Sequence, residues 1–465
     1  MRFFSLFITA QFLFGISSCA QKQNTDLSLA GPWLMTLTTK DVGELQLLMT
    51  FEATGLEGKD SNSFRAFSQK DIDKLVLGSL KAGLGRIAGS NFKDGSLIRI
   101  ANGSFSKDSI HGVLVTPFGN YYIDAGHNDG TLDGQLADGR HTKVGVIRAN
   151  KGMPVLPLRN DPLIVDNALK LAEERLYDPA ILKTKVWIDF TKEIKRISAL
   201  TGDDAALVMA FFYHGRKLPF SHFALYRQTN TPSALEDKPE AISEVRLVNK
   251  EDRTAYLIIN SFAGDAETID SIFRQIAAKE YKHLVVDLRG NSGGSIEAGM
   301  AFIRHLLPDT VYGGVFLTQK YFAKNRALPR LQDYQHFPHF SEANYDLLIK
   351  GISDYEAVCL KAYPQPPIFR GETYVLTDEK TASTCEPIVY ALKQLHLATI
   401  VGKTTAGAML NGESFSAGEG FVITVPTATY YTSDGVKIDQ RGVEPDIASE
   451  DALAFVLEKI SKKRD

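Results

Sequence analysis

Cysteine is scarce in this sequence, with three in 465 residues: Cys19, Cys359 and Cys385. So small a number excludes a disulfide framework, and the three are not spaced like the ligands of a structural zinc site. Cys19 lies near the N-terminus, which leaves Cys359 and Cys385 in the remainder of the chain. We expect Cys385 to be a free, buried thiol, with a single bridge to Cys359 as the alternative.

An excess of charge of one sign is also lacking. The 52 Lys and Arg residues nearly balance the 55 Asp and Glu residues, the net charge is −3, and no long basic stripe occurs. Composition therefore gives no support to nucleic-acid binding. Hydrophobic residues make up 44% and charged residues 23%, as in an ordinary globular protein, and the length corresponds to about two to four domains.

One apolar run dominates the N-terminus, from Phe3 to Ile16 after Arg2. It is too short to span a bilayer as a mature helix and is typical of an export signal. The Ser17-Ser18-Cys19 sequence that follows resembles a bacterial lipobox, which implies cleavage before Cys19 and lipid attachment to its thiol. We therefore expect a lipoprotein signal peptide at 1–19 and a membrane-anchored protein of the bacterial cell envelope, on the periplasmic or outer-membrane face. An ordinary cleaved signal is the alternative.

Three hydrophobic patterns divide the rest of the chain. Residues 27–150 contain alternating apolar segments between turn signals such as Asp133-Gly134, which predicts an antiparallel β-domain, either a barrel or a sandwich. Residues 160–232 have apolar residues at helical spacing, which predicts a helical cap. Residues 240–465 alternate short apolar strands with helices, which predicts an α/β core of strands and crossover helices.

A glycine-rich turn follows the predicted strand 283–287 and precedes a predicted helix. Its glycines permit positive φ angles and leave backbone amides exposed, which can bind a phosphate or a developing oxyanion. The turn lacks the lysine of a phosphate-binding loop and the glycine spacing of a dinucleotide site. Its sequence is Asp287-Leu288-Arg289-Gly290-Asn291-Ser292-Gly293-Gly294.

Ser383 lies between the predicted strand 373–377 and the helix that follows. A serine in this place most often caps the helix, and Glu386 three residues later fits a capping box. A nucleophilic serine needs the same place, because free N–H groups and the helix dipole stabilise an oxyanion. Ser383 alone is therefore ambiguous between a cap and a nucleophile.

Two further motifs, at 401–408 and 442–446, complete a pattern with the glycine-rich turn and the Ser383 segment. In this order the four resemble the C-terminal-processing and tricorn-like serine peptidases over about residues 256–447. The resemblance implies a crotonase/ClpP-like core with Ser383 as nucleophile. It also implies an oxyanion hole made by the backbone N–H groups of Gly293 and Thr384, with Gly294 contacting substrate.

One departure from that family concerns the base. Ala408 stands where family members with a Ser–Lys dyad have the lysine, and Lys403 is not at the dyad position. A serine without a base is a weak nucleophile. The tricorn-like branch uses a histidine after the helical cap, which implies His222 as the base here and Ser221 as a substrate contact. A structural role is the alternative for His222, and His214 is its nearest competitor.

An acidic residue is expected to support the histidine. The resemblance implies Asp439, and Glu386 is the alternative. The segment from His222 to Tyr256 is too short for the PDZ domain that many family members insert there. We therefore expect an exported serine peptidase that forms an acyl-enzyme on peptide substrates and needs no metal or cofactor. Alternatives are an inactive ligand- or peptide-binding lipoprotein on this scaffold, as in retinoid-binding relatives, and a small-molecule esterase or amidase.

Overall fold

The computed structural model describes residues 29–462, except for 40–42, 54–62, 69–97, 107, 117–118, 129, 140, 153–158, 202, 229–244, 252, 263–265, 326 and 342–344. The predicted signal peptide and Cys19 lie outside the described residues, so export and lipidation stay predictions. Within the described ranges, no helix combines the length and apolar character that a membrane crossing requires.

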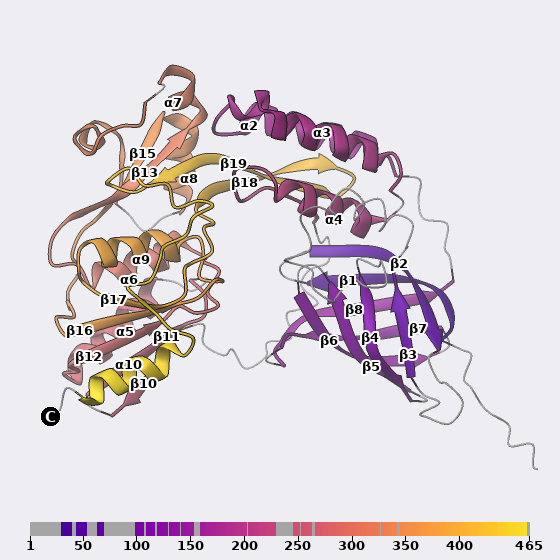
Figure 1. Ribbon diagram of the computed structural model, residues 1–465, viewed down its shortest axis with the longest axis horizontal. Helices are drawn as coiled ribbons and strands as arrows, with labels where there is room; N and C mark the ends of the chain where they lie inside the picture. The colour runs from indigo at the N-terminus through magenta and orange to yellow at the C-terminus, as the bar shows by residue number, and fades with distance from the viewer. Residues whose placement is uncertain are drawn as a thin grey trace, which may run out of the picture.

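The N-terminal part is a closed antiparallel β-barrel (Figure 1). Strand β1 pairs with β2 on one side and with β8 on the other, which closes the sheet. Alternate residues of β1 face inward, so Trp33, Met35 and Leu37 are buried. The predicted antiparallel β-domain is confirmed. Its strands are β1 (Gly31–Thr39), β2 (Gly43–Ala53), β3 (Ser63–Phe67), β4 (Arg99–Phe105), β5 (Ser109–Thr116), β6 (Gly119–Asn128), β7 (Thr131–Ala137) and β8 (Lys143–Lys151).

The turn predicted at Asp133-Gly134 is wrong, because both residues lie inside β7 and pair with β6. A Cβ atom on Gly134 would lie 2.4 Å from the Cα atom of Ala125. Glycine is therefore needed here because two strands approach each other closely. The sequence alone does not distinguish such a glycine from one in a turn.

Three helices follow the barrel: α2 (Asp161–Arg175), α3 (Lys185–Ser198) and α4 (Asp204–Gly215). Each begins after a polar side chain that accepts a backbone hydrogen bond in the first turn, and these caps are Asn160, Thr184 and Asp203. In Figure 1 they lie above the barrel and beside the upper strands of the core. Helix α4 contacts barrel strand β2, and α2 contacts strands of the core. The short strand β9 (Ala224–Arg227) comes next.

The core contains a six-stranded sheet that is parallel except for its first strand. Successive residues of its strands face opposite sides. Leu284 and Val286 pack with α5, α6 and α9, whereas Val285 packs against α10. The strands are β10 (Val245–Lys250), β11 (Thr254–Ile259), β12 (His283–Asp287), β16 (Glu372–Thr377), β17 (Thr399–Gly402) and β20 (Ile447–Ala448), and the helices are α5 (Ala266–Ala278), α6 (Ile296–Arg304), α9 (Cys385–Gln394) and α10 (Ala452–Ser461).

A second layer of strands lies across α6 and α9, and its long strand β19 also pairs with β9. The C-terminal part is therefore an α/β core of the predicted kind, with strands on both sides of the helices. The remaining elements are β13 (Val311–Thr318), β14 (His339–Phe340), β15 (Ala357–Ala362), β18 (Leu410–Gly418), β19 (Phe421–Tyr431), α7 (Gln319–Lys324) and α8 (Tyr345–Asp354), with short 3-10 turns at Ile181–Lys183 and Leu331–His336.

Candidate active site

Ser383 lies in the short loop between β16 and α9 and has a positive φ of 54°. This left-handed conformation is uncommon for a residue with a side chain. Helix α9 begins at Cys385 with Thr384 as its N-cap residue, so Ser383 stands just before the cap. Its side chain is half-buried. Ser383 is therefore not the N-cap residue of α9, and a strained, partly exposed serine at a helix start fits the geometry of a nucleophile.

The glycine-rich turn packs directly on this serine. A Cβ atom on Gly293 would lie 2.7 Å from the Cβ atom of Ser383, and Gly293 has a φ of 105°. Two features of this position therefore require glycine: its positive φ and its close approach to Ser383. The hydroxyl of Thr384 donates to the carbonyl oxygen of Gly294 at 2.8 Å, which ties the two loops together.

The backbone amides around Ser383 differ in their availability. The N–H of Gly293 donates to Oδ1 of Asn291 at 2.8 Å. Among the described residues, the N–H groups of Gly294 and Thr384 have no hydrogen-bond acceptor. The structure thus leaves the predicted Thr384 donor unoccupied, whereas the predicted Gly293 donor is engaged by a side chain of its own turn.

His222 belongs to the loop that joins α4 to β9 and also has a positive φ, of 56°. Its Nδ1 lies 2.7 Å from Oγ of Ser221, and that hydroxyl donates to Oδ1 of Asp439 at 2.5 Å. The backbone N–H of Ser221 donates to Oδ2 of the same carboxylate at 3.2 Å. Asp439 therefore acts on the histidine through Ser221, whose expected role was substrate contact.

This arrangement determines the tautomer of His222. Ser221 has one hydroxyl proton, which is donated to a carboxylate that can only accept, so its Oγ accepts the proton of His222 Nδ1. The Nε2 atom then carries a free lone pair, as a general base requires. Burial lowers the pKa of His222, and the negative charge of Asp439 opposes this shift. The imidazole is consequently neutral at neutral pH.

The side chain of Asp439 is buried. Burial raises the pKa of its carboxyl group, while the Ser221 hydrogen bonds and the positive charge of Lys437 lower it. Lys437 itself lies over the ring of Tyr177 at 5.7 Å. Asp439, the acid expected just before the motif 442–446, is thus linked to His222 through Ser221. The nearby ammonium group of Lys437 supports its negative charge.

Glu386 lies on the serine side of the site. Its buried carboxylate accepts from the backbone N–H groups of Ser383, Gly407 and Ala408, at 3.1, 2.7 and 2.8 Å, and from the Thr405 hydroxyl at 2.7 Å. Burial raises the pKa of Glu386, and these four donors oppose that shift. Among the described residues Glu386 has no hydrogen bond to a histidine, so it holds the Ser383 loop instead.

A chain of contacts joins the two halves of the site. The N–H of Gly407 donates to Glu386, and the carbonyl oxygen of Gly407 accepts from the N–H of Gln440 at 2.7 Å. Gln440 directly follows Asp439 in the sequence. No hydrogen bond connects the Ser383 hydroxyl to His222 among the described residues.

The remaining predicted residues lie elsewhere. Ala408 offers only its backbone to the site, and the half-buried Lys403 pairs with Glu450 at 2.9 Å. His214 is buried near the end of α4, where burial lowers its pKa to about 4 and its Nε2 has no hydrogen-bond partner among the described residues. Both Cys359 and Cys385 are free and buried, which confirms the expected thiol.

Comparisons with known proteins relate this part of the chain to a family of peptidases. A model of peptidase family S41 matches residues 253–449. The chloroplastic carboxyl-terminal-processing peptidase 1 of Arabidopsis thaliana is 22% identical over 301 residues, which are 64% of this chain and 54% of that protein. The carboxy-terminal processing protease CtpB of Bacillus subtilis is 26% identical over 195 residues, which are 42% of this chain and 33% of that protein. The chain thus spans about half and a third of the length of these relatives.

Among solved structures, a lipoprotein from Streptococcus agalactiae aligns over 67% of this chain and 99% of its own, at 16% identity and a TM-score of 0.44. The tricorn protease aligns over 90% of this chain and 54% of its own, at 11% identity and a TM-score of 0.41. The segment that matches the family model, residues 253–449, contains the glycine-rich turn and Ser383. Residues 253–449 of this chain match the model of peptidase family S41, and both relatives found by sequence are C-terminal-processing peptidases.

Proposed function

We propose that the protein is an exported serine peptidase that cleaves peptide bonds through an acyl-enzyme. The observation that carries the proposal is Ser383 itself, held at a positive φ against Gly293 and next to the N–H of Thr384, which has no acceptor among the described residues. A signal peptide and a lipid on Cys19, expected from the N-terminal sequence, would place it on the bacterial cell envelope.

The first chemical step joins Ser383 to the substrate. Oγ attacks the carbonyl carbon of the scissile bond while its proton passes to Nε2 of His222. The oxyanion accepts from the N–H of Thr384 and from the glycine-rich turn, where the N–H of Gly294 is the donor without an acceptor among the described residues. Asp439 stabilises the resulting imidazolium through the Ser221 hydroxyl.

The second half of the reaction returns the enzyme to its starting state. The imidazolium donates its proton to the departing amine, and the acyl group remains as an ester on Ser383. Water then attacks this ester with His222 as base again, which releases the new carboxylate. The reaction requires His222 and Ser383 to come within hydrogen-bond distance when substrate binds, a tightening common to sites described without ligand.

Covalent labelling with an alkyl fluorophosphonate tests this proposal. We expect the full-length protein to be labelled at Ser383, no labelling in Ser383→Ala, and labelling at least about 100-fold slower in His222→Ala. Ser353→Ala, which changes an exposed serine far from the site in the sequence, serves as control and should react like the wild type.

The labelling result also separates the alternatives. A folded protein that is not labelled at Ser383 would be an inactive binding protein rather than a peptidase. Equally fast labelling of His222→Ala would contradict the role of His222 as base and, with it, the proposed mechanism. Labelling together with cleavage of acyl esters but of no peptide would instead identify an esterase.

A further inference from the structure

Tyr177, which follows the C-terminal end of α2, contacts both segments that meet at the Ser221–Asp439 hydrogen bond. Its ring packs edge to face on the ring of Phe220, the residue before Ser221, with 6.4 Å between the ring centres. The ammonium group of Lys437, two residues before Asp439, lies over the same tyrosine ring at 5.7 Å from its centre. One residue of the helical cap therefore contacts neighbours of both residues that orient the base.

The position of Tyr177 is fixed by further contacts. Its side chain is buried, and its backbone N–H donates to the carbonyl oxygen of Pro426 on β19 at 3.0 Å. Its ring also packs against the ring of Phe322, with 5.9 Å between the centres. Because β19 belongs to the core, Tyr177 links the end of α2 to the part of the chain that contains the site.

The ammonium group of Lys437 is held by this tyrosine rather than by an acid. Its Nζ donates to the Tyr177 hydroxyl at 3.4 Å, and among the described residues no carboxylate lies within ion-pair distance of it. A cation over an aromatic face is favoured electrostatically, and more strongly where water is excluded. Burial lowers the pKa of Lys437, while the charges of Asp439 and Asp178 oppose this shift. The charge of Lys437 is therefore not cancelled by a direct contact and acts on Asp439.

The ionised form of Asp439 gives His222 the tautomer that a base needs. The two carboxylate oxygens accept from the hydroxyl and from the N–H of Ser221. If Asp439 were protonated, its O–H could donate to Oγ of Ser221, whose own proton would then be donated to Nδ1 of His222. The imidazole would carry its proton on Nε2 and could not accept one from Ser383. The charge state of Asp439 therefore determines the direction of these hydrogen bonds.

The other charged groups around this cluster act mainly on its outer members. Asp178 and Arg441 act on Lys437 in opposite directions. Burial raises the pKa of Tyr177, and the neighbouring Asp439, Tyr431 and Asp178 add to this shift, so its hydroxyl stays uncharged. The charges that lower the pKa of Asp439 are those of Lys437 and of the imidazole that it serves.

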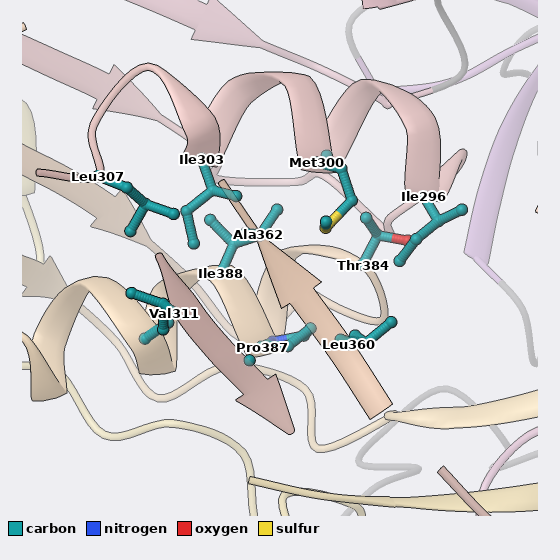
Figure 2. Close-up of a pocket in the computed structure, with 13 residues that line it drawn as sticks. Ile296, Met300, Ile303, Leu307, Val311, Leu360, Ala362, Thr384, Pro387 and Ile388 are labelled. Carbon is teal, nitrogen blue, oxygen red and sulfur yellow. The ribbon is translucent and has the colours of Figure 1, made fainter. Parts of the chain in front are cut away.

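A small apolar cavity lies between α6 and α9 on the side of Thr384 (Figure 2). Its volume is about 40 Å³, which leaves room for no more than a few water molecules. Aliphatic side chains such as Met300, Ile303 and Ile388 line it, and no Asp, Glu, Lys, Arg or His does so in the described part of the chain. This cavity therefore contributes no charge to the site, in contrast to the histidine side, where Lys437 lies.

We propose that Tyr177 and Lys437 are positioning residues of the proposed peptidase. Tyr177 holds the ammonium group of Lys437 near Asp439, and this charge keeps the acid ionised, so that the hydrogen bonds run from the imidazole towards it. The inference rests on the proposed peptidase function and extends it. It gives the end of α2 a role in the activity of a base that lies outside that helix.

The pH dependence of labelling by an alkyl fluorophosphonate tests the inference on the full-length protein, with intact mass followed between pH 4 and 9. Lys437→Met removes the charge and keeps most of the length of the side chain. We expect its acid limb to lie about 0.5 to 1 pH unit above that of the wild type, because the loss of a cation favours protonation of both Asp439 and His222. On this limb labelling should be about 3- to 10-fold slower at equal pH, whereas near pH 8 it should change by less than about 2-fold.

A charge-conserving variant separates this role from simple packing. Lys437→Arg keeps the charge and can lie over the same ring, so its acid limb should coincide with that of the wild type. Lys170→Met, which changes an exposed lysine of α2, is the matched control and should also leave the limb in place. If Lys437→Arg and Lys437→Met instead slow labelling equally at every pH, Lys437 has only a packing role and the inference is wrong.

A double variant tests whether Tyr177 acts through the ammonium group. Tyr177→Leu removes the ring and the hydroxyl and should move the acid limb in the same direction as Lys437→Met. Added to Lys437→Met, it should cause no further movement. An equal movement with and without Lys437 would show that the ring acts independently and would contradict the inference. Should Tyr177→Leu fail to fold, the two Lys437 variants still decide the role of the charge.

The outcomes also distinguish this inference from the peptidase proposal. If the wild type is labelled at Ser383 and the acid limb of Lys437→Met coincides with it, the inference is wrong and the peptidase proposal stands. If the folded wild type is not labelled at any pH, the peptidase proposal itself is overturned.

Discussion

Ser383 and His222 both adopt left-handed backbone conformations, at φ angles of 54° and 56°. Each such residue costs about 1–3 kcal/mol, and the surrounding structure must compensate. Here the compensation comes from two buried carboxylates: Glu386 accepts the Ser383 N–H, and Asp439 accepts the Ser221 N–H directly before His222. The acids thus hold the backbone of the site, besides the role of Asp439 toward the imidazole.

The pH dependence of peptide cleavage follows from the surroundings of His222. Because burial lowers the pKa of this base, the acid limb of kcat/KM should lie below pH 6.5, the ordinary histidine value. Asp439→Asn removes the charge that opposes this shift, so the limb should move to still lower pH. At the same time kcat should fall by about 100-fold or more, since the imidazolium loses its support.

Profiles of kcat/KM between pH 4 and 9 would check this prediction, with exposed Asp309→Asn as control. An acid limb that moves to higher pH in Asp439→Asn, or one that stays in place with unchanged kcat, would contradict the assigned role.

Among the elements, the first turn of α9 also holds neighbouring segments of the chain in place. Glu386 in that turn binds the segment 405–408 between β17 and β18 as well as the Ser383 loop. All four partners are donors, so the amide nitrogen of a glutamine would face at least one N–H or hydroxyl donor and leave it unsatisfied. Burial makes such a loss costly.

We therefore expect Glu386→Gln to lower the free energy of unfolding by about 1–3 kcal/mol and to slow labelling of Ser383. Urea unfolding followed by tryptophan fluorescence measures the first effect. Exposed Glu379→Gln, a few residues earlier, should change stability by less than about 0.5 kcal/mol. Equal stability of the two variants would show that the Glu386 contacts contribute little.

On the scale of the whole molecule, one ionic cluster joins the barrel, the helices and the core. Asp204 of α4 accepts from the N–H of Gln46 on β2, pairs with Arg159, and bonds Arg227 of β9 at 2.7 Å. Both guanidinium groups lie over the ring of Phe421 on β19. The loop with His222 runs between α4 and β9, so this cluster supports the elements that carry the base.

Asp204→Asn should accordingly destabilise the protein by about 2 kcal/mol. The value is below that for a fully buried pair because the arginine side chains are 16% and 28% exposed. Hydrogen exchange should increase in β2, α4 and β9 together. Asp189→Asn, which loses only an exposed pair with Lys185, is the control. Faster exchange confined to α4 would show that the cluster does not couple the three elements.

Several parts of the fold and site could be predicted from local sequence. The alternating pattern of β1 and the apolar strands of the core determine which faces are buried, since periodicity follows from backbone geometry alone. The glycine-rich turn was recognisable because its backbone conformation restricts the residues allowed there, whereas the Ser383 loop was predicted from the family resemblance of the four motifs. Asp439 was predicted from its neighbouring motif rather than from any physical requirement of its own.

The tertiary structure alone decided how these pieces meet. Asp133-Gly134 became part of a strand, and Asn291 took the N–H of Gly293. Ser221 came to stand between Asp439 and His222 although 218 positions separate it from that acid. Hydrogen-bond partners so distant in sequence are determined by the packing of whole elements, which no local pattern records. The sequence, through its family resemblance, predicts Ser383 as nucleophile and His222 as base, and the folded chain determined what holds each of them.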